Sequence, residues 1–91
     1  MMLKLKEVYN SGSGWNIREV MINPAHIVAM REDYTAKSAL YENRMPQGLS
    51  QSVTFTRIYL NSGQSSLEVV VTDPPEIIES KINNAKRLLK G

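Results

Sequence analysis

The C-terminal segment carries a sustained helical pattern of apolar residues, and this limits what the rest of the chain can form. Asp73-Pro74-Pro75-Glu76 is typical of a helix start, because proline fits the first turn and Asp73 can accept a hydrogen bond from an early backbone N–H. The stripe that follows at helical spacing consists of Ile77, Ile78, Ile82, Ala85, Leu88 and Leu89. The sequence therefore predicts an amphipathic helix that needs an apolar surface to cover.

The preceding residues favour extended structure and supply that surface. The expected strands are Leu3–Tyr9, Trp15–Ile22, Ile27–Met30, Val53–Leu60 and Leu67–Thr72. Gly12 and Gly14 favour a turn between the first two strands, and Asn61-Ser62-Gly63-Gln64 favours one between the last two. Two hairpins are therefore expected. We predict a single α+β domain over residues 1–91, with an antiparallel sheet of four or five strands and the C-terminal helix packed on one face.

Residues 34–52 show no sustained periodicity. Pro46 and Gly48 lie near the end of this stretch, and several serine and glutamine residues follow them. Such a long connection is uncommon inside a compact domain and is often mobile. We predict a long loop at about 34–52. It could form a long hairpin tip with a frayed helical turn around Ala36–Tyr41. Folding is expected not to require it.

Composition narrows the class of protein. With 91 residues the chain has room for one core, and 42% hydrophobic with 22% charged residues is an ordinary globular balance. There is no cysteine, which excludes disulfides and thiolate metal sites. No apolar run approaches the roughly 18 residues of a membrane span, and the start Met-Met-Leu-Lys-Leu-Lys does not have the apolar core of a signal peptide. A cytoplasmic protein without a membrane span is the expectation.

Basic and aromatic residues alternate along the predicted strands, although the formal charge is only +2. The candidate interaction residues are Lys4, Lys6, Trp15, Arg18, Arg31, Arg57 and Tyr59. A sheet face of this kind could stack unpaired bases and contact phosphates. Alternatively, the aromatic rings fill or edge the core while the basic groups keep the outer face soluble. The small net charge favours this second interpretation, because nucleic-acid binders usually carry a strong basic field.

No arrangement of residues is typical of catalysis. His26 is the single histidine, and a metal site around it would need carboxylates such as Glu32 or Asp33. Ser11-Gly12-Ser13-Gly14 resembles a phosphate-binding loop in composition only, because the lysine and hydroxyl ending of such loops is missing. We therefore expect no catalytic residues, no metal and no cofactor, with His26 at a turn or strand edge.

Two stretches together resemble the small FlbD-like flagellar protein family. In the first, Val20–Glu32, an apolar strand leads into Asn23-Pro24 and then to Ile27 and an acidic end. The second runs from Thr56 through a glycine turn and a valine-rich strand to the helix at Glu76–Ile82. The resemblance covers about half the chain. The first turn is longer here than in the family, and Tyr34–Ser52 is an insertion where the family has a short turn. The resemblance implies a sheet-plus-helix domain of bacterial or phage origin, and the family is associated with flagellar assembly or motor function.

The sequence thus predicts a non-catalytic protein-interaction or assembly module of unknown partner. Self-association is expected, through the helix or through an edge strand with few charges, especially Val69-Val70-Val71. The alternative is a weak nucleic-acid-binding regulator that uses the basic and aromatic sheet face.

Overall fold

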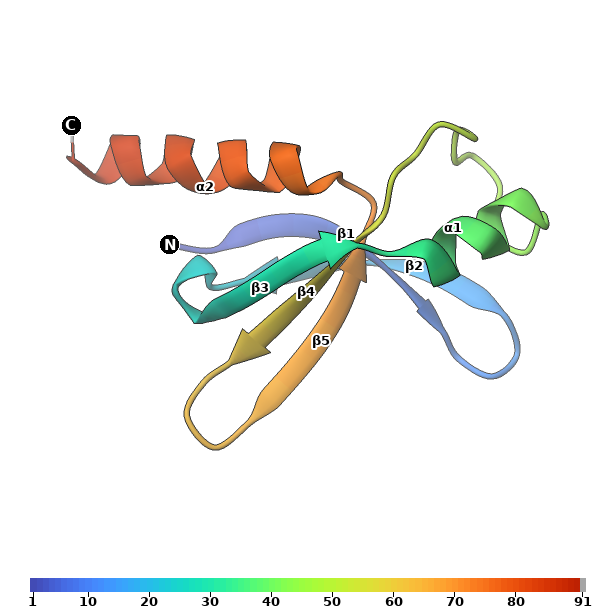
Figure 1. Ribbon diagram of the computed structural model, residues 1–91, viewed down its shortest axis with the longest axis horizontal. Helices are drawn as coiled ribbons and strands as arrows, with labels where there is room; N and C mark the ends of the chain where they lie inside the picture. The colour runs from blue at the N-terminus through green and yellow to red at the C-terminus, as the bar shows by residue number, and fades with distance from the viewer. Residues whose placement is uncertain (91) are drawn as a thin grey trace.

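A computed structural model describes residues 1–90, and side chains for residues 1–87 (Figure 1). Its elements are β1 (Leu3–Asn10), β2 (Trp15–Ile22), the 3-10 turn η1 (Pro24–His26), β3 (Ile27–Glu32), α1 (Tyr34–Tyr41), β4 (Thr56–Asn61), β5 (Ser66–Val71) and α2 (Pro75–Lys90). The strands form one five-stranded antiparallel sheet in the order β2-β1-β5-β4-β3. The predicted α+β fold, with its C-terminal helix packed on the sheet, is confirmed.

Both predicted hairpins form, but the valine-rich strand of the second hairpin does not lie at the edge of the sheet, where it is predicted. Leu3 lies opposite Ile22 in the first hairpin, and Leu60 lies opposite Leu67 in the second. The run Val69–Val71 belongs to β5, which pairs with β1 on one side and β4 on the other. The prediction that this run forms an exposed edge is therefore wrong. The edge strands of the described sheet are β2 and β3.

The larger core lies on the sheet face that α2 covers. Alternation along the strands brings six buried side chains to this face: Leu3, Leu5, Ile22, Ile58, Val69 and Val71. Ile78 of α2 joins them with no exposed surface, and Ile82, one turn later, is half-buried against the same cluster. The predicted stripe residues Leu88 and Leu89 lie outside the residues with described side chains. The helix is thus anchored by its first two turns.

The start of α2 differs in one detail from the predicted cap. The Asp73 carboxylate accepts a hydrogen bond from Nζ of Lys81 at 2.7 Å. The amides of Ile77 and Ile78 donate to the carbonyl oxygen of Pro74, at 3.1 and 3.2 Å. Asp73 therefore pairs with a side chain two turns into the helix, and its own carbonyl accepts a hydrogen bond from the Thr56 hydroxyl.

The predicted loop at 34–52 is wrong in its first half, because residues 34–41 form helix α1. Asp33 caps this helix, and its Oδ2 accepts a hydrogen bond from the Ala36 amide at 2.9 Å. At the other end Asn43 adopts a positive φ of 60°. The Asn43 amide donates to the carbonyl of Leu40 and the Arg44 amide to that of Ala39, which is the Schellman pattern of helix termination.

Helix α1 and the segment after it build a second core on the opposite face of the sheet. The buried members are Val8, Ala36, Leu40 and Phe55, with Trp15, Ile17, Met45, Leu49, Val53 and Val70 half-buried around them. The Lys37 ammonium group donates hydrogen bonds to the carbonyls of Gln51 and Val53, which ties the segment to α1. The insertion is therefore part of the packed structure and covers apolar surface at Val8 and Val70.

Candidate functional site

The seven candidate interaction residues do not form one surface. Arg31 lies opposite Arg57 in the β3–β4 pair, and Tyr59 follows two residues later on the same face. Lys4 and Lys6 lie on β1, which β5 separates from β4. Arg18 and Trp15 lie apart from these residues. Arg18 is opposite Glu7 on the face that holds the larger core, and Trp15 is at the edge of the second core.

Arg57 is held by two carboxylates. Its Nε and Nη2 lie 2.9 and 2.8 Å from Oδ1 of the buried Asp33, and its Nη1 lies 2.8 Å from Oε2 of Glu68. Burial lowers the pKa of the Arg57 guanidinium, but the hydrogen bonds and charges of Asp33 and Glu68 outweigh this and raise the pKa above its usual value. The positive charge of Arg57 is therefore neutralised within the fold.

Asp33 connects three elements, and its loss should be costly. Asp33→Ala removes both the cap of α1 and the partner of Arg57, so we expect the free energy of unfolding to fall by about 2–4 kcal/mol. Asp33→Asn should cost less, because asparagine caps helices about as well as aspartate. Urea denaturation of both variants measures the difference. Equal losses would show that the cap contributes little, and no loss from Asp33→Ala would contradict the whole assignment.

The other two arginines among the candidates, Arg18 and Arg31, also make contacts within the fold. Nε of Arg18 lies 2.8 Å from Oε1 of Glu7, and this hydrogen bond and charge raise the pKa of the Arg18 guanidinium. The same guanidinium stacks on the ring of Tyr9 at 3.9 Å from the centroid. Arg31 lies 5.3 Å from the centroid of the Tyr59 ring. These contacts occupy the cations and rings that a nucleic-acid surface would need to present.

Trp15 and the two lysines offer little more for base stacking. Trp15 is half-buried against the second core, and its indole Nε1 is buried without a hydrogen-bond partner among the described residues. Lys4 and Glu19 form an exposed ion pair at 4.0 Å, and Lys6 is exposed beside them on β1. Trp15 thus lies against the second core, whereas Tyr59 is half-buried beside Arg31.

We expect binding to single-stranded nucleic acid to be weak and to disappear as salt rises. Few cations remain free to neutralise phosphates, so the affinity should depend on a small electrostatic term. Fluorescence anisotropy with a labelled oligonucleotide, titrated at low and at physiological salt, measures this. Tight binding that persists at high salt would contradict the expectation and would assign stacking to Tyr59 or Trp15.

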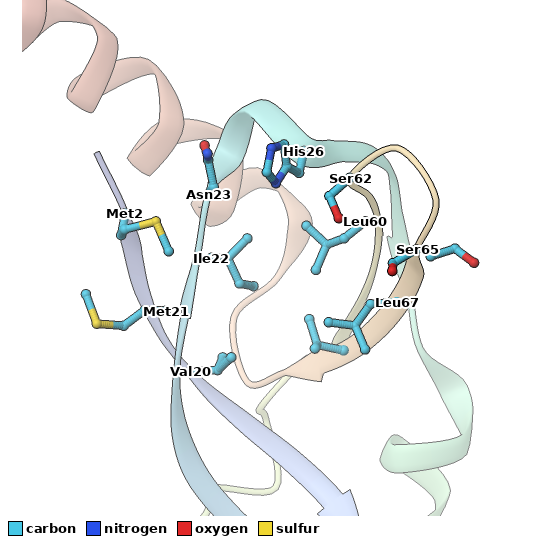
Figure 2. A pocket seen from close by; sticks show the side chains of 12 residues that line it. Met2, Val20, Met21, Ile22, Asn23, His26, Leu60, Ser62, Ser65 and Leu67 are labelled. Carbon is cyan, nitrogen blue, oxygen red and sulfur yellow. The ribbon is translucent and has the colours of Figure 1, made fainter.

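The surface feature that stands apart is an apolar groove of about 530 Å³. The groove is bounded by the C-terminal end of β2, by η1 and by the β4–β5 hairpin (Figure 2), and its lining residues are Met2, Val20, Met21, Ile22, Asn23, His26, Leu60, Ser62, Ser65, Ser66, Leu67 and Val69. Figure 2 shows Ile22 and Leu60 pointing into it from opposite sides. Its floor is continuous with the larger core.

The two walls of the groove belong to strands that do not pair with each other. In the described sheet β1 and β5 pair only at Glu7–Val71 and Val8–Val70. Beyond these pairs the β4–β5 hairpin swings away from β1 and β2 (Figure 1). Leu67 near the start of β5 is 60% exposed although its strand neighbour Val69 is buried. Apolar side chains on the inner face of the hairpin are therefore in contact with water.

The polar lining of the groove is small and neutral. Asn23 caps η1, since its Oδ1 accepts a hydrogen bond from the Ala25 amide at 3.0 Å. His26 ends η1 and is exposed, as a turn histidine is expected to be. Glu32 ends β3 and Asp33 follows it, at the far end of a six-residue strand that spans about 20 Å. Within the residues that the structure describes, no group of three or more acidic, histidine or cysteine side chains is arranged to hold a metal.

Of the residues that line this groove, the sequence patterns single out His26 and, as part of a possible edge strand, Val69. Met2, Met21 and Leu67 each follow the local strand pattern and look like core or strand-end residues. The one available signal is that Leu67 is an apolar residue directly after a turn, where the covered part of a strand often ends. Their exposure depends on how β2 and the β4–β5 hairpin lie relative to each other, which no local pattern reports.

Comparison with protein-family models, with curated proteins and with solved structures returned no match. In the part of the chain that the structure describes, no helix has the length and apolar character needed to cross a membrane. The function therefore has to be inferred from the groove and from the surfaces around it.

Proposed function

We propose that this chain is a non-catalytic protein-interaction or assembly module whose contact surface is the apolar groove between β2 and the β4–β5 hairpin. The observation that carries the proposal is the exposure of large apolar side chains at the rim of a hollow that reaches the core. Leu67 is 60% exposed and Met2 49%. Contiguous apolar surface of this kind typically marks an interaction site.

The composition of the groove suits a protein partner. Apolar anchors that fill a desolvated pocket supply most of the binding energy of protein interfaces. Methionine is unbranched and polarizable, so Met2 can adjust to a partner's side chains. The serine hydroxyls and the amide of Asn23 at the rim provide the polar border that such interfaces carry. The paired cations of the outer face argue against the alternative of a nucleic-acid-binding regulator.

The resemblance to the FlbD-like family supports the same class of function. That family is associated with flagellar assembly or motor function, and the resemblance here covers the strands and turns on both sides of the groove. It supports an assembly role without naming the assembly. We propose a protein as the partner and a role inside the cell, in keeping with the absence of cysteine from the sequence.

Site-specific photocrosslinking in the cells that make the protein tests this proposal. A photoreactive residue at Leu67 should give a crosslinked protein species when irradiated. The matched control is Tyr41 on α1, which is 62% exposed and lies at the other end of the molecule (Figure 1). Crosslinks from Tyr41 alone, or none from either position, would contradict the groove as a protein contact.

A further inference from the structure

We propose that the partner in the groove is a second copy of this chain, related by a two-fold axis that passes through the groove. This inference rests on the proposed function, because it names the partner of the same site. Three observations on the groove carry it: its shape, its lack of charge and its place at the edge of the sheet.

The groove carries both the projecting and the receiving parts of a contact. Leu67 and Met2 project at its rim, while the hollow between Ile22 and Leu60 lies a few residues away (Figure 2). A two-fold interface uses the same patch on both copies, so the patch must be complementary to itself. A rim of projecting side chains beside a hollow meets this requirement, because the rim of each copy can fill the hollow of the other.

The charge pattern also favours a second copy. The chain has 11 Lys or Arg residues and nine Asp or Glu residues, and none of them lines the groove. Near a two-fold axis each residue faces its own copy, so any charged residue there would meet a like charge. A partner of opposite charge would instead call for charged groups at the rim. The neutral lining therefore suits self-association better than binding to an acidic or basic protein.

Covering the groove would bury apolar surface that a small domain otherwise leaves in contact with water. A domain of this size buries only a modest share of the surface that its unfolded chain exposes, so pairing adds burial it otherwise lacks. The wall formed by Val20 and Ile22 belongs to the edge strand β2. The second copy would thus cover the exposed end of the larger core and would shield one end of an edge strand as well.

Sedimentation equilibrium of purified protein tests the proposal with two groove variants and two controls. We expect the wild-type chain to have twice the chain mass at high concentration. Leu67→Asp should raise the dissociation constant roughly a hundredfold, because a two-fold interface contains each substitution twice. Met2→Glu should act in the same direction from the opposite rim of the groove, where Met2 is 49% exposed. Tyr41→Asp and Ile77→Asp, on exposed apolar positions of α1 and α2, should leave the dimer intact.

Circular dichroism establishes that each variant is folded before its mass is interpreted. A wild-type chain that stays monomeric at the highest concentration would overturn the proposal. A dimer that survives both groove substitutions but dissociates with Ile77→Asp would also overturn it and would assign the contact to α2. A monomer whose Leu67 position still crosslinks to another protein leaves the proposed function standing, whereas a monomer without such crosslinks removes both.

Discussion

Replacing Ile78 by alanine is expected to lower the free energy of unfolding by about 2–5 kcal/mol. Ile78 has no exposed surface and packs among Ile22, Ile58 and Val71, so its truncation leaves a cavity where the helix meets the sheet. A domain of this size has a margin of only about 5–10 kcal/mol. Urea denaturation should therefore show the variant close to the limit of folding at room temperature.

The neighbouring isoleucine provides the matched control. Ile77 is 45% exposed, so Ile77→Ala deletes the same atoms with a much smaller loss. Ile82→Ala should fall between the two because Ile82 is half-buried against the cluster. Lys81→Ala should cost no more than about 1 kcal/mol, since it removes a partly exposed ion pair with Asp73. Similar effects from Ile77→Ala and Ile78→Ala would contradict the packing of α2 on the sheet.

Truncating Phe55 should be about as damaging, by about 3–5 kcal/mol. Phe55 is fully buried in the second core with Leu40 and Val8.

The same core makes the insertion necessary, so replacing residues 36–51 by a short Gly-Ser turn should destabilise the fold severely, the reverse of the expectation from sequence. Thermal unfolding of both variants measures this. A melting temperature within a few degrees of wild type for the replacement would show that the insertion is dispensable after all.

Local patterns were sufficient to predict the hairpins and α2. Alternation at Leu3 and Leu5, the glycine turns and the stripe containing Ile78 and Ile82 are each decided by neighbours in sequence, and the structure keeps them. Helix α1 was hidden because it is short and its buried face consists largely of alanine. Its signals were Asp33 at the cap and Ala36, Ala39 and Leu40 at helical spacing, and they are weak beside the apolar runs of the strands.

The position of β5 and the groove depend on contacts between residues far apart in the chain. Val69–Val71 has the composition of an edge or a central strand, and only its pairing with both β1 and β4 decides between them. The ion pairs of Arg18 and Arg57 likewise join different strands or elements, so the sequence shows the cations but not their partners. The groove brings together residues of β2, η1 and the β4–β5 hairpin, which are far apart in the chain, and no local pattern shows that they meet.

Methyl NMR across a concentration series shows whether the chain associates with itself through the groove. With isoleucine, leucine, valine and methionine methyl groups labelled, one spectrum reports the groove and its alternatives together. We expect concentration-dependent shifts at Leu60, Leu67 and Met2, with Ile77 on α2 and Val28 on the edge strand β3 unchanged. Shifts confined to Ile77 or Val28, or spectra that do not change with concentration, would contradict this expectation.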